Sequence, residues 1–484
     1  MVVDFRLVLK LLGQALVAVG CLSFIPMAYA YFNELPGGYE FGLTGLVTVG
    51  AGVLLTRSRS SSQAGASIRE LFLFTALLWI TITLMAAVPL YLLVPDLSAG
   101  GALFESASGL STTGATVLDK LESRPQSVLL WRSLLQFIGG IGFVVIAVAV
   151  LPNAAMGGMN LFKTESSSFD GSSKITPHVK TMALSFLLWY LLTLVLCSFL
   201  YILGGFDTFV AINAAMCTVS TGGMMPLDAS MNGASPFIQY TAIVFMFLGS
   251  LPFMLIIGSI FGSFSTLLRD QQVRGFCVLA LALTLAVYLA LILINGYDPE
   301  RALRVALFNV ISIISSTGFA LEDFSQWNRF ATALFFIVLA LGGCSGSTAG
   351  GIKIFRMQIC FSMFKAQLVK TIHPHQIIEP RFNHKVIDSE TLRSVITYLV
   401  AYVMVTMLSA ALASCLGLEL LDAISATTTC LSNIGPVIGQ ALTPSGNFSA
   451  LSDSLHVLFA CDMIIGRLEI LPVLLCLTRL FWRR

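Results

Sequence analysis

Long apolar stretches with few charged residues recur along the whole chain, from Leu11 to Phe481, and short polar links separate them. We count ten that could cross a hydrocarbon core of roughly 30 Å. The composition agrees, because 56% of the 484 residues are hydrophobic and only 11% are charged, far from the balance of a soluble domain. The sequence therefore predicts an all-α polytopic membrane protein with about ten spans.

A short motif that ends in glycine recurs four times between these stretches. The runs Ala-Leu-Phe-Glu and Ala-Leu-Phe-Asn end nine residues before Gly114 and Gly318, and further copies end at Gly222 and Gly435. Each copy has about ten to twelve residues, too few to span. Irregular backbone at membrane depth is tolerated only where protein buries it or where it lines a water-filled cavity. We therefore predict four pseudo-repeated units of helix, pore loop and helix around one central pore.

The repeat divides the chain into an N-terminal helical hairpin with its link, residues 1–69, and four pore units. The first unit is 70–152, and the second is 153–264, which begins with a cytoplasmic link. The third is 265–392, which includes an interrupted second helix and a cytoplasmic link, and the fourth is 393–484. The alternative is that glycine beside serine or threonine only permits close helix packing. That alternative explains one copy more easily than four.

Three of the four motifs carry a hydroxyl side chain directly before the glycine, and the fourth carries Asn433 and Ile434. A dehydrated potassium ion needs a cage of oxygens, which backbone carbonyls supply without a fixed charge that would bind it too tightly. Glycine can adopt positive φ, which turns carbonyls toward one axis, and the C-terminal ends of the short helices would direct partial negative charge to the centre. We predict a filter that holds K+ by its carbonyls only. The predicted filter residues are Thr112, Thr113, Gly114, Ser220, Thr221, Gly222, Ser316, Thr317, Gly318, Asn433, Ile434 and Gly435.

Basic residues are distributed unevenly over the predicted links. If the N-terminus is cytoplasmic, 20 Lys or Arg lie on the inner side, 6 on the outer side and Arg467 within a span. The positive-inside rule therefore predicts that both termini are cytoplasmic. About 15 acidic residues lie outside against 8 inside, so the outer mouth should attract cations. The run Ala28-Tyr29-Ala30 resembles a signal-peptidase site, but the short apolar segment Phe41 to Leu55 favours an uncleaved hairpin.

A glycine-rich string from Gly342 to Gly351 interrupts the last predicted span of the third unit. It contains five glycines, each of which costs a helix about 1 kcal/mol relative to alanine, so we predict a loop within the membrane. A small-residue packing face is the alternative, and the string lacks the Gly-Lys-Ser/Thr of a phosphate-binding loop. Arg467 is the one basic residue predicted inside a span, where charge is a functional hypothesis by default. Ion pairing with Glu469 or Asp462 is the structural alternative.

These motifs resemble the Trk/Ktr/HKT superfamily of potassium transporters, most closely its bacterial TrkH branch, over roughly Glu70 to Arg484. The resemblance implies potassium uptake through a selective, gated, channel-like pore in the bacterial inner membrane. It also implies a homodimer and a cytosolic TrkA-like nucleotide-binding ring as regulatory partner. Some plant members that prefer sodium have serine for the first filter glycine, whereas this chain keeps all four glycines. The residues that the resemblance assigns to the gate are Gly342, Gly343, Ser345, Gly346, Ser347, Gly350, Gly351 and Arg467.

Other functions are less consistent with the sequence. A potassium symporter coupled to H+ or Na+ remains open, although symporters usually have inverted repeats and this repeat is parallel. No enzyme is predicted, because catalytic fingerprints are missing and an intramembrane protease would need a partner for His456. A metal site at His373 and His375 lacks further ligands. The basic link around these histidines fits docking of a cytosolic protein or anionic lipid. The ten cysteines lie mostly in apolar stretches and are expected to be core residues; no organic cofactor or nucleic acid is predicted.

Overall fold

The computed structural model describes residues 3–58, 67–149, 175–376, 378–439 and 446–482. Apart from one two-stranded hairpin, the regular structure in these residues is helical, as predicted. Six helical segments are long and apolar enough to cross a membrane, and one bent pair of helices is a seventh candidate. The predicted ten spans therefore go beyond what helix length and composition support. The predicted boundary between residues 152 and 153 lies outside the described residues.

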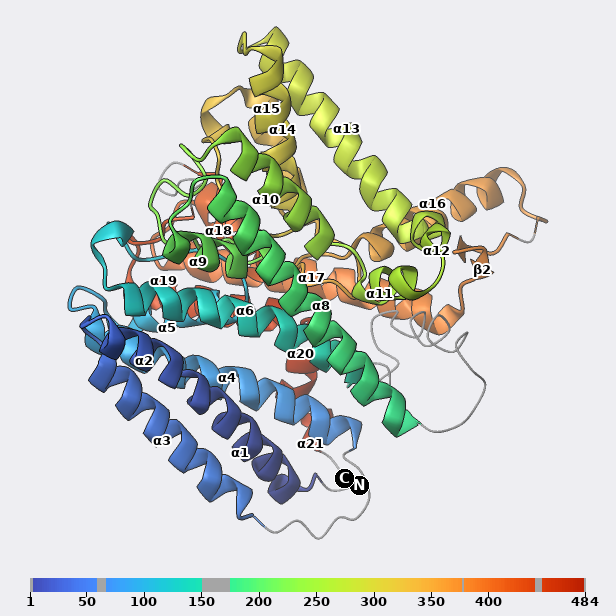
Figure 1. Ribbon diagram of the computed structural model, residues 1–484. Helices are drawn as coiled ribbons and strands as arrows, with labels where there is room; N and C mark the ends of the chain where they lie inside the picture. The colour runs from blue at the N-terminus through green and yellow to red at the C-terminus, as the bar shows by residue number, and fades with distance from the viewer. Residues whose placement is uncertain (1–2, 59–66, 150–174, 377, 440–445, 483–484) are drawn as a thin grey trace.

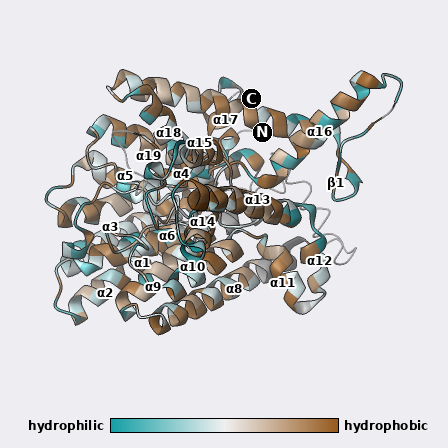
Figure 2. Ribbon diagram, turned by 90° about the horizontal axis from the view of Figure 1, so that it is seen from above, coloured by the Kyte–Doolittle hydropathy of each residue, from teal (hydrophilic) through white to brown (hydrophobic). Residues whose placement is uncertain are grey.

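The candidate spans expose apolar side chains on their outer faces. Figure 2 shows hydrophobic residues along α8, α13 and α17, where Leu188, Leu281 and Met404 are more than half exposed. Apolar faces of this extent suit contact with lipid rather than water. The six spans are α1 (Phe5–Leu22) with α2 (Phe24–Phe32), α3 (Gly38–Thr56), α4 (Ile68–Leu93), the part of α8 (Ile175–Leu203) from Ala183, α13 (Gln271–Leu293) and α17 (Ser389–Cys415).

Four shorter helices lie in the interior, and most of their residues are buried. Each starts directly after a residue with an oxygen-bearing side chain, and the side chains of Ser98 and Asp207 accept hydrogen bonds from the first turn. Such caps satisfy backbone amides that have no partner within the helix. The four are α5 (Ala99–Leu110), α9 (Thr208–Val219), α14 (Pro299–Ile314) and α18 (Leu420–Ser432).

The helices that follow the four short ones are mostly broken. α10 (Pro236–Gly249) and α11 (Phe253–Phe261) meet at a 98° bend, where Pro252 cannot donate a backbone hydrogen bond. α19 (Asp453–Arg467) ends before Glu469 and Ile470, which both have positive φ. These breaks explain part of the difference between the predicted and the identified number of spans. The helices concerned, besides the unbroken α6 (Gln126–Ala149), also include α15 (Arg329–Val338), α16 (Ile354–Ile372), α20 (Leu471–Leu477) and α21 (Arg479–Trp482).

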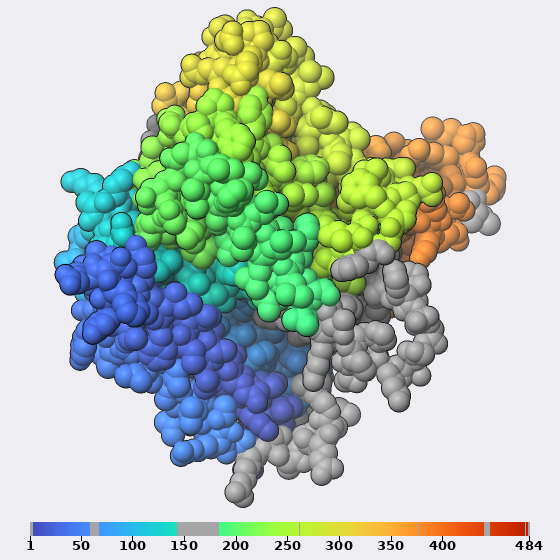
Figure 3. Space-filling view, viewed as in Figure 1, coloured from blue at the N-terminus to red at the C-terminus, as the bar shows by residue number. Residues whose placement is uncertain are grey.

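The N-terminal helices form one flank of the molecule (Figures 1 and 3). α1 and α3 pack at backbone contact, because a Cβ added at Gly13 would lie 2.6 Å from the carbonyl oxygen of Gly52. The two termini lie close together (Figure 1), and the rings of Phe5 and Trp482 stack at 6.0 Å. Both ends of the chain are therefore on the same face of the protein.

A small polar subdomain lies at the end of α16. β1 (Arg381–Phe382) and β2 (Lys385–Val386) pair antiparallel around Asn383 and His384, which both have positive φ, as a tight hairpin turn requires. Asn383 also bonds to Asp270 at the start of α13. The remaining short helices are η1 (Leu121–Ser123), α12 (Phe264–Arg269) and η3 (Phe324–Gln326).

Candidate functional site: a ring of four loops

Each of the four short interior helices ends in a loop of the same backbone conformation. A residue with φ near that of a left-handed helix follows the helix, and a glycine with positive φ comes two residues later. The amide between them donates to the carbonyl five residues earlier, as Thr113 does to Ser108 at 2.9 Å. The φ pairs are Thr112 56° and Gly114 87°, Thr221 52° and Gly223 78°, Ser316 55° and Gly318 81°, and Asn433 54° and Gly435 99°.

The second loop differs by one residue from the predicted alignment. We aligned Gly222 with Gly114, but Gly222 donates to the carbonyl of Cys217 at 2.8 Å and has no positive φ, so it matches Thr113. The glycine that matches Gly114 is Gly223. The two neighbouring glycines allowed both registers in the sequence, and only the positive φ separates them. Gly223 is therefore a site residue that the sequence reasoning missed.

The four loops close into a ring. A Cβ added at Gly114 would lie 2.4 Å from the carbonyl oxygen of Gly222, and one at Gly435 would lie 2.6 Å from that of Thr113. The other two junctions are tighter, because a Cβ at Gly223 or at Gly318 would lie 1.9 Å from a carbonyl oxygen of the next loop. Real Cβ atoms do not approach oxygen this closely, so each junction requires glycine. The ring brings together the predicted filter segments of all four loops.

One side of the ring opens into a pocket, which we call the vestibule. Gly114, Gly223 and Gly318 line its base, and its empty volume, including the part open to solvent, is about 450 Å³. The other lining residues are Thr116, Leu118, Leu121, Arg132, Met224, Met225, Leu227, Asp228, Ser230 and Asn447.

Carboxyl groups lie around the vestibule. Glu122 accepts a hydrogen bond from the amide of Asp228 at 3.0 Å, and Asp228 accepts one from the amide of Leu121. Partial burial raises the pKa of Asp228, and the neighbouring carboxyl group of Glu122 raises it further. The hydrogen bond with Asp228 lowers the pKa of Glu122. The two carboxyl groups therefore lie close enough to affect each other's ionisation at the vestibule.

The glycine-rich string lies against the opposite side of the ring. As predicted, it interrupts a helix, because α15 ends at Val338 and α16 starts at Ile354. The amide of Gly350 donates to the Ser316 hydroxyl, and the hydroxyls of Thr348 and Thr221 are 3.0 Å apart. The string therefore touches the second and third loops directly beneath the ring.

The string folds back on itself and is held by backbone hydrogen bonds. The amide of Gly342 donates to the carbonyl of Ile352 at 2.9 Å, which closes the base of the string. A Cβ at Gly342 would lie 1.9 Å from the carbonyl oxygen of Gly350. The two ends of the string can therefore approach this closely only with glycine at position 342. The amide of Phe253 donates to Gly346 at 3.0 Å, which ties the string to the bend between α10 and α11.

The other predicted gate residues also lie within this folded string. Gly343 packs against Ala349, and Gly351 has a positive φ of 67° at the base. The Ser347 hydroxyl donates to the carbonyl of Cys344 at 2.6 Å. The amide of Ser345 donates to the side chain of Gln272 on α13. The string is thus a packed segment that makes defined contacts with its neighbours.

Arg467 lies beside the string and is buried. Its guanidinium donates to the carbonyl oxygens of Thr348 at 2.9 Å and Gly139 at 3.3 Å. The carboxylates that we considered as partners have other contacts: Glu469 pairs with Arg356 at 2.5 Å, and Asp462 accepts a hydrogen bond from Ser409.

Two further basic residues lie next to the string, on its C-terminal side. Lys353 and Arg356, which we counted with the inner links, are buried with 3% and 1% of their surface exposed. Lys353 donates to the carbonyl of Ala349 in the string, and Arg356 stacks on Tyr398 at 3.7 Å. Because the string ends only two residues before Lys353, the sequence could have indicated this cluster.

No group of three potential metal ligands occurs in the part of the chain that the structure describes. His373 and His375 are exposed on the polar subdomain.

Fold and site together define a helical membrane protein with a ring of four backbone loops at its centre. The sequence profile of the TrkH family, described as a cation transport protein, matches residues 40–481. The chain belongs to the TrkH family of cation transport proteins. These are transporters rather than enzymes, in agreement with the sequence-based prediction.

Individual relatives resemble the chain over its whole length. The Trk system potassium uptake protein TrkI of Halomonas elongata is 36% identical over 479 residues, which cover 99% of this chain and 97% of that protein. The Trk system potassium uptake protein TrkH of Escherichia coli K12 is 29% identical over 99% of each chain. The crystal structure of the potassium transporter TrkH from Vibrio parahaemolyticus has a TM-score of 0.91 at 28% identity and covers 99% of this chain and 100% of that one.

Proposed function

We propose that this protein takes up potassium through a selective, channel-like pore that passes through the ring of four loops. The ring is the observation that carries the proposal, because it brings a backbone carbonyl oxygen from each of four loops against the positive-φ glycine of a neighbouring loop. Carbonyl oxygens replace the hydration shell of K+ without a fixed charge. The relatives described as potassium uptake proteins support the choice of ion.

The glycine-rich string and Arg467 form the proposed gate. The string contacts the ring from the side opposite the vestibule, so an ion that leaves the ring would meet it directly. The guanidinium of Arg467 binds the string through Thr348, and its positive charge would raise the barrier for a cation. Opening would require the string to move away from Ser316 and Thr221.

The proposed location is the bacterial inner membrane, with ten spans, both termini in the cytoplasm and the vestibule outside. Contact between Phe5 and Trp482 supports an even number of crossings. The acidic groups at the vestibule suit an entrance for cations. We also propose a homodimer, for which the exposed apolar helix faces provide surface.

The proposed regulatory partner is a cytosolic TrkA-like nucleotide-binding ring. α16 follows the string directly and carries the exposed residues Lys365 and Lys370, and the hairpin beyond it carries Arg381 and Lys385. A partner bound to this basic surface would be connected to the gate through a single helix.

Current measurements on reconstituted protein distinguish a channel-like pore from a symporter. With a potassium gradient across a planar bilayer, the proposal predicts a reversal potential that follows the potassium gradient alone. The reversal potential should stay the same when the proton or sodium gradient is changed. A shift with either gradient would favour potassium symport coupled to H+ or Na+, and the channel-like pore would be rejected.

A further inference from the structure

The second loop lacks a side chain that the other three loops have. At the position directly before the positive-φ glycine, Thr113, Thr317 and Ile434 are completely buried. The second loop has Gly222 at this position. Without a replacement, the space behind this part of the ring would be empty, and close-packed protein interiors rarely leave such voids.

Gln136 from α6 fills this space. Its side chain is completely buried, and a Cβ added at Gly222 would lie 2.5 Å from its Cδ atom. The residue at 222 and the side chain at 136 therefore exclude each other. A larger residue at 222 would require a smaller one at 136.

The amide of Gln136 also fixes the backbone of the second loop. Its Nε2 donates to the carbonyl oxygen of Gly222, and its Oε1 accepts from the amide of Met224 at 3.0 Å. These partners fix the orientation of the side-chain amide, because its NH2 group must face a hydrogen-bond acceptor and its oxygen must face a donor. A buried amide with both ends bonded holds its partners in one geometry.

The carbonyl of Gly222 is one of the four that close the ring, since it faces Gly114 of the first loop. Among the described residues, none donates a hydrogen bond to the matching carbonyls of Thr113, Thr317 or Ile434. The ring is therefore asymmetric, with one carbonyl whose direction a side chain sets.

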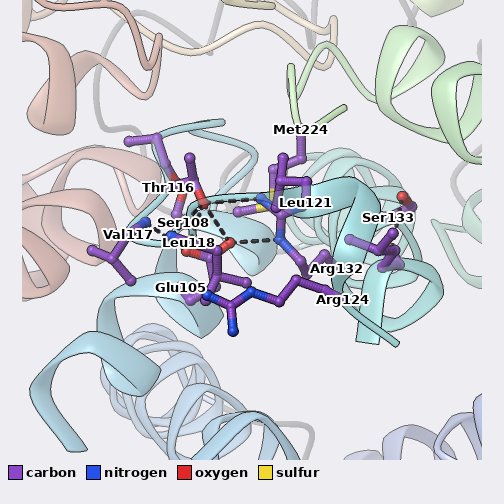
Figure 4. A network of polar contacts seen from close by, with 12 residues as sticks. Glu105, Ser108, Thr116, Val117, Leu118, Leu121, Arg124, Arg132, Ser133 and Met224 are labelled. Atoms are coloured by element: carbon purple, nitrogen blue, oxygen red, sulfur yellow. Dashed lines mark hydrogen bonds and ion pairs between the residues drawn. The ribbon is translucent and has the colours of Figure 1, made fainter. Parts of the chain in front are cut away.

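Arg132, one turn before Gln136 on α6, reinforces the same junction. Figure 4 shows Arg132, Glu105 and Thr116 in one network, in which the Arg132 Nε to Glu105 Oε1 distance is 2.6 Å. Glu105 also accepts from the amide of Val117 at 2.9 Å, and Arg132 reaches the carbonyl of Met225 at 3.4 Å. α6 thus holds the first and second loops on the vestibule side of the ring.

We propose that Gln136 is a positioning residue that determines potassium over sodium selectivity, because it replaces the missing side chain at 222 and fixes the Gly222 carbonyl. The inference rests on the proposed function of the ring as an ion filter. Selectivity in carbonyl filters depends on the size of the cage and on the field and freedom of its carbonyls. A released carbonyl could move toward a smaller ion, so sodium permeation should increase.

The test measures the potassium to sodium permeability ratio of protein in proteoliposomes. Gln136→Met keeps the side-chain volume but loses both hydrogen bonds, and the ratio should fall about tenfold, the effect of one lost hydrogen bond. Gln136→Ala should lower it at least as much. Trp131→Phe is the matched control, because it removes a buried hydrogen bond of the same helix, to Ala86 at 3.1 Å, away from the ring.

A double substitution tests the replacement directly. In the first and third loops the threonine hydroxyl bonds to a serine two residues earlier, at 2.6 Å from Ser111 and 2.7 Å from Ser315. Gly222→Thr in the Gln136→Ala background would recreate this pair with Ser220. The double variant should therefore regain selectivity over Gln136→Ala alone.

The outcomes separate the role of Gln136 from the filter proposal itself. A normal ratio in folded Gln136→Met and Gln136→Ala, or an equal loss in Trp131→Phe, would overturn the role of Gln136. A double variant that stays as unselective as Gln136→Ala would also overturn it. If the unmodified protein itself fails to discriminate, the filter proposal fails instead. Size-exclusion profiles and thermal unfolding show whether each variant is folded.

Discussion

Replacing Gly223 with alanine is expected to remove potassium selectivity and most of the potassium flux. Its φ of 78° is unfavourable for an L-residue, and the new Cβ would lie 1.9 Å from the carbonyl oxygen of Thr317 in the next loop. Backbone must shift at the ring, and we expect at least a tenfold loss, which is about 1.4 kcal/mol. Flux of potassium and sodium into proteoliposomes measures the effect.

Gly233→Ala is the matched control for this substitution. Gly233 has a similar φ of 87°, but an added Cβ would have no neighbour within 4 Å. Alanine at 233 is strained by the positive φ in the same way, but it does not contact the ring. Transport should therefore stay near normal. Equal behaviour of the two variants would show that backbone strain alone, and not the ring junction, explains the loss, and the assignment of Gly223 to the ring would be lost with it.

Replacing Arg467 with alanine is expected to increase potassium flux about tenfold, since a unit charge at about 10 Å and an effective dielectric constant of about 20 contributes more than 1 kcal/mol. The substitution also frees the carbonyl of Thr348 in the string. Arg301→Ala is the control, because Arg301 is an exposed arginine in an ion pair with Glu322. Unchanged or lower flux in folded Arg467→Ala protein would contradict the gating role.

Deletion of residues 343–350 tests the string separately from the charge. The ends of the deleted segment can be rejoined, since a Cβ at Gly351 would lie 3.0 Å from the Cα of Gly342. If the string blocks the pathway, flux should rise, and Arg467→Ala should add little in this background. A deletion variant that folds but conducts no better than the unmodified protein would exclude the string as the gate.

The features that could be predicted from the sequence are those that depend on local backbone chemistry. The positions of Gly114, Gly318 and Gly435 followed from repeated motifs, and the interruption of a helix at Gly342 to Gly351 followed from glycine content. Helicity and the apolar outer faces followed from composition. Each of these rests on residues close to one another in the chain.

The features that could not be predicted depend on contacts between distant segments. Gln136 occurs in an apolar stretch without a visible partner, and only the fold brings it to Gly222. The register of the second loop was ambiguous because glycine occupies both 222 and 223. Lys353 and Arg356 read as flanking charges, since the sequence does not reveal that the folded string draws them into the interior.

The most direct test of the potassium pore compares K+, Rb+, Na+ and Li+ permeation through purified protein in proteoliposomes. K+ and Rb+ are expected to pass, and Na+ and Li+ to be largely excluded, because the ring presents fixed carbonyl oxygens. Empty liposomes and the Gly223→Ala variant provide the background. Sodium permeation equal to that of potassium would contradict the assignment of the ring as a potassium filter.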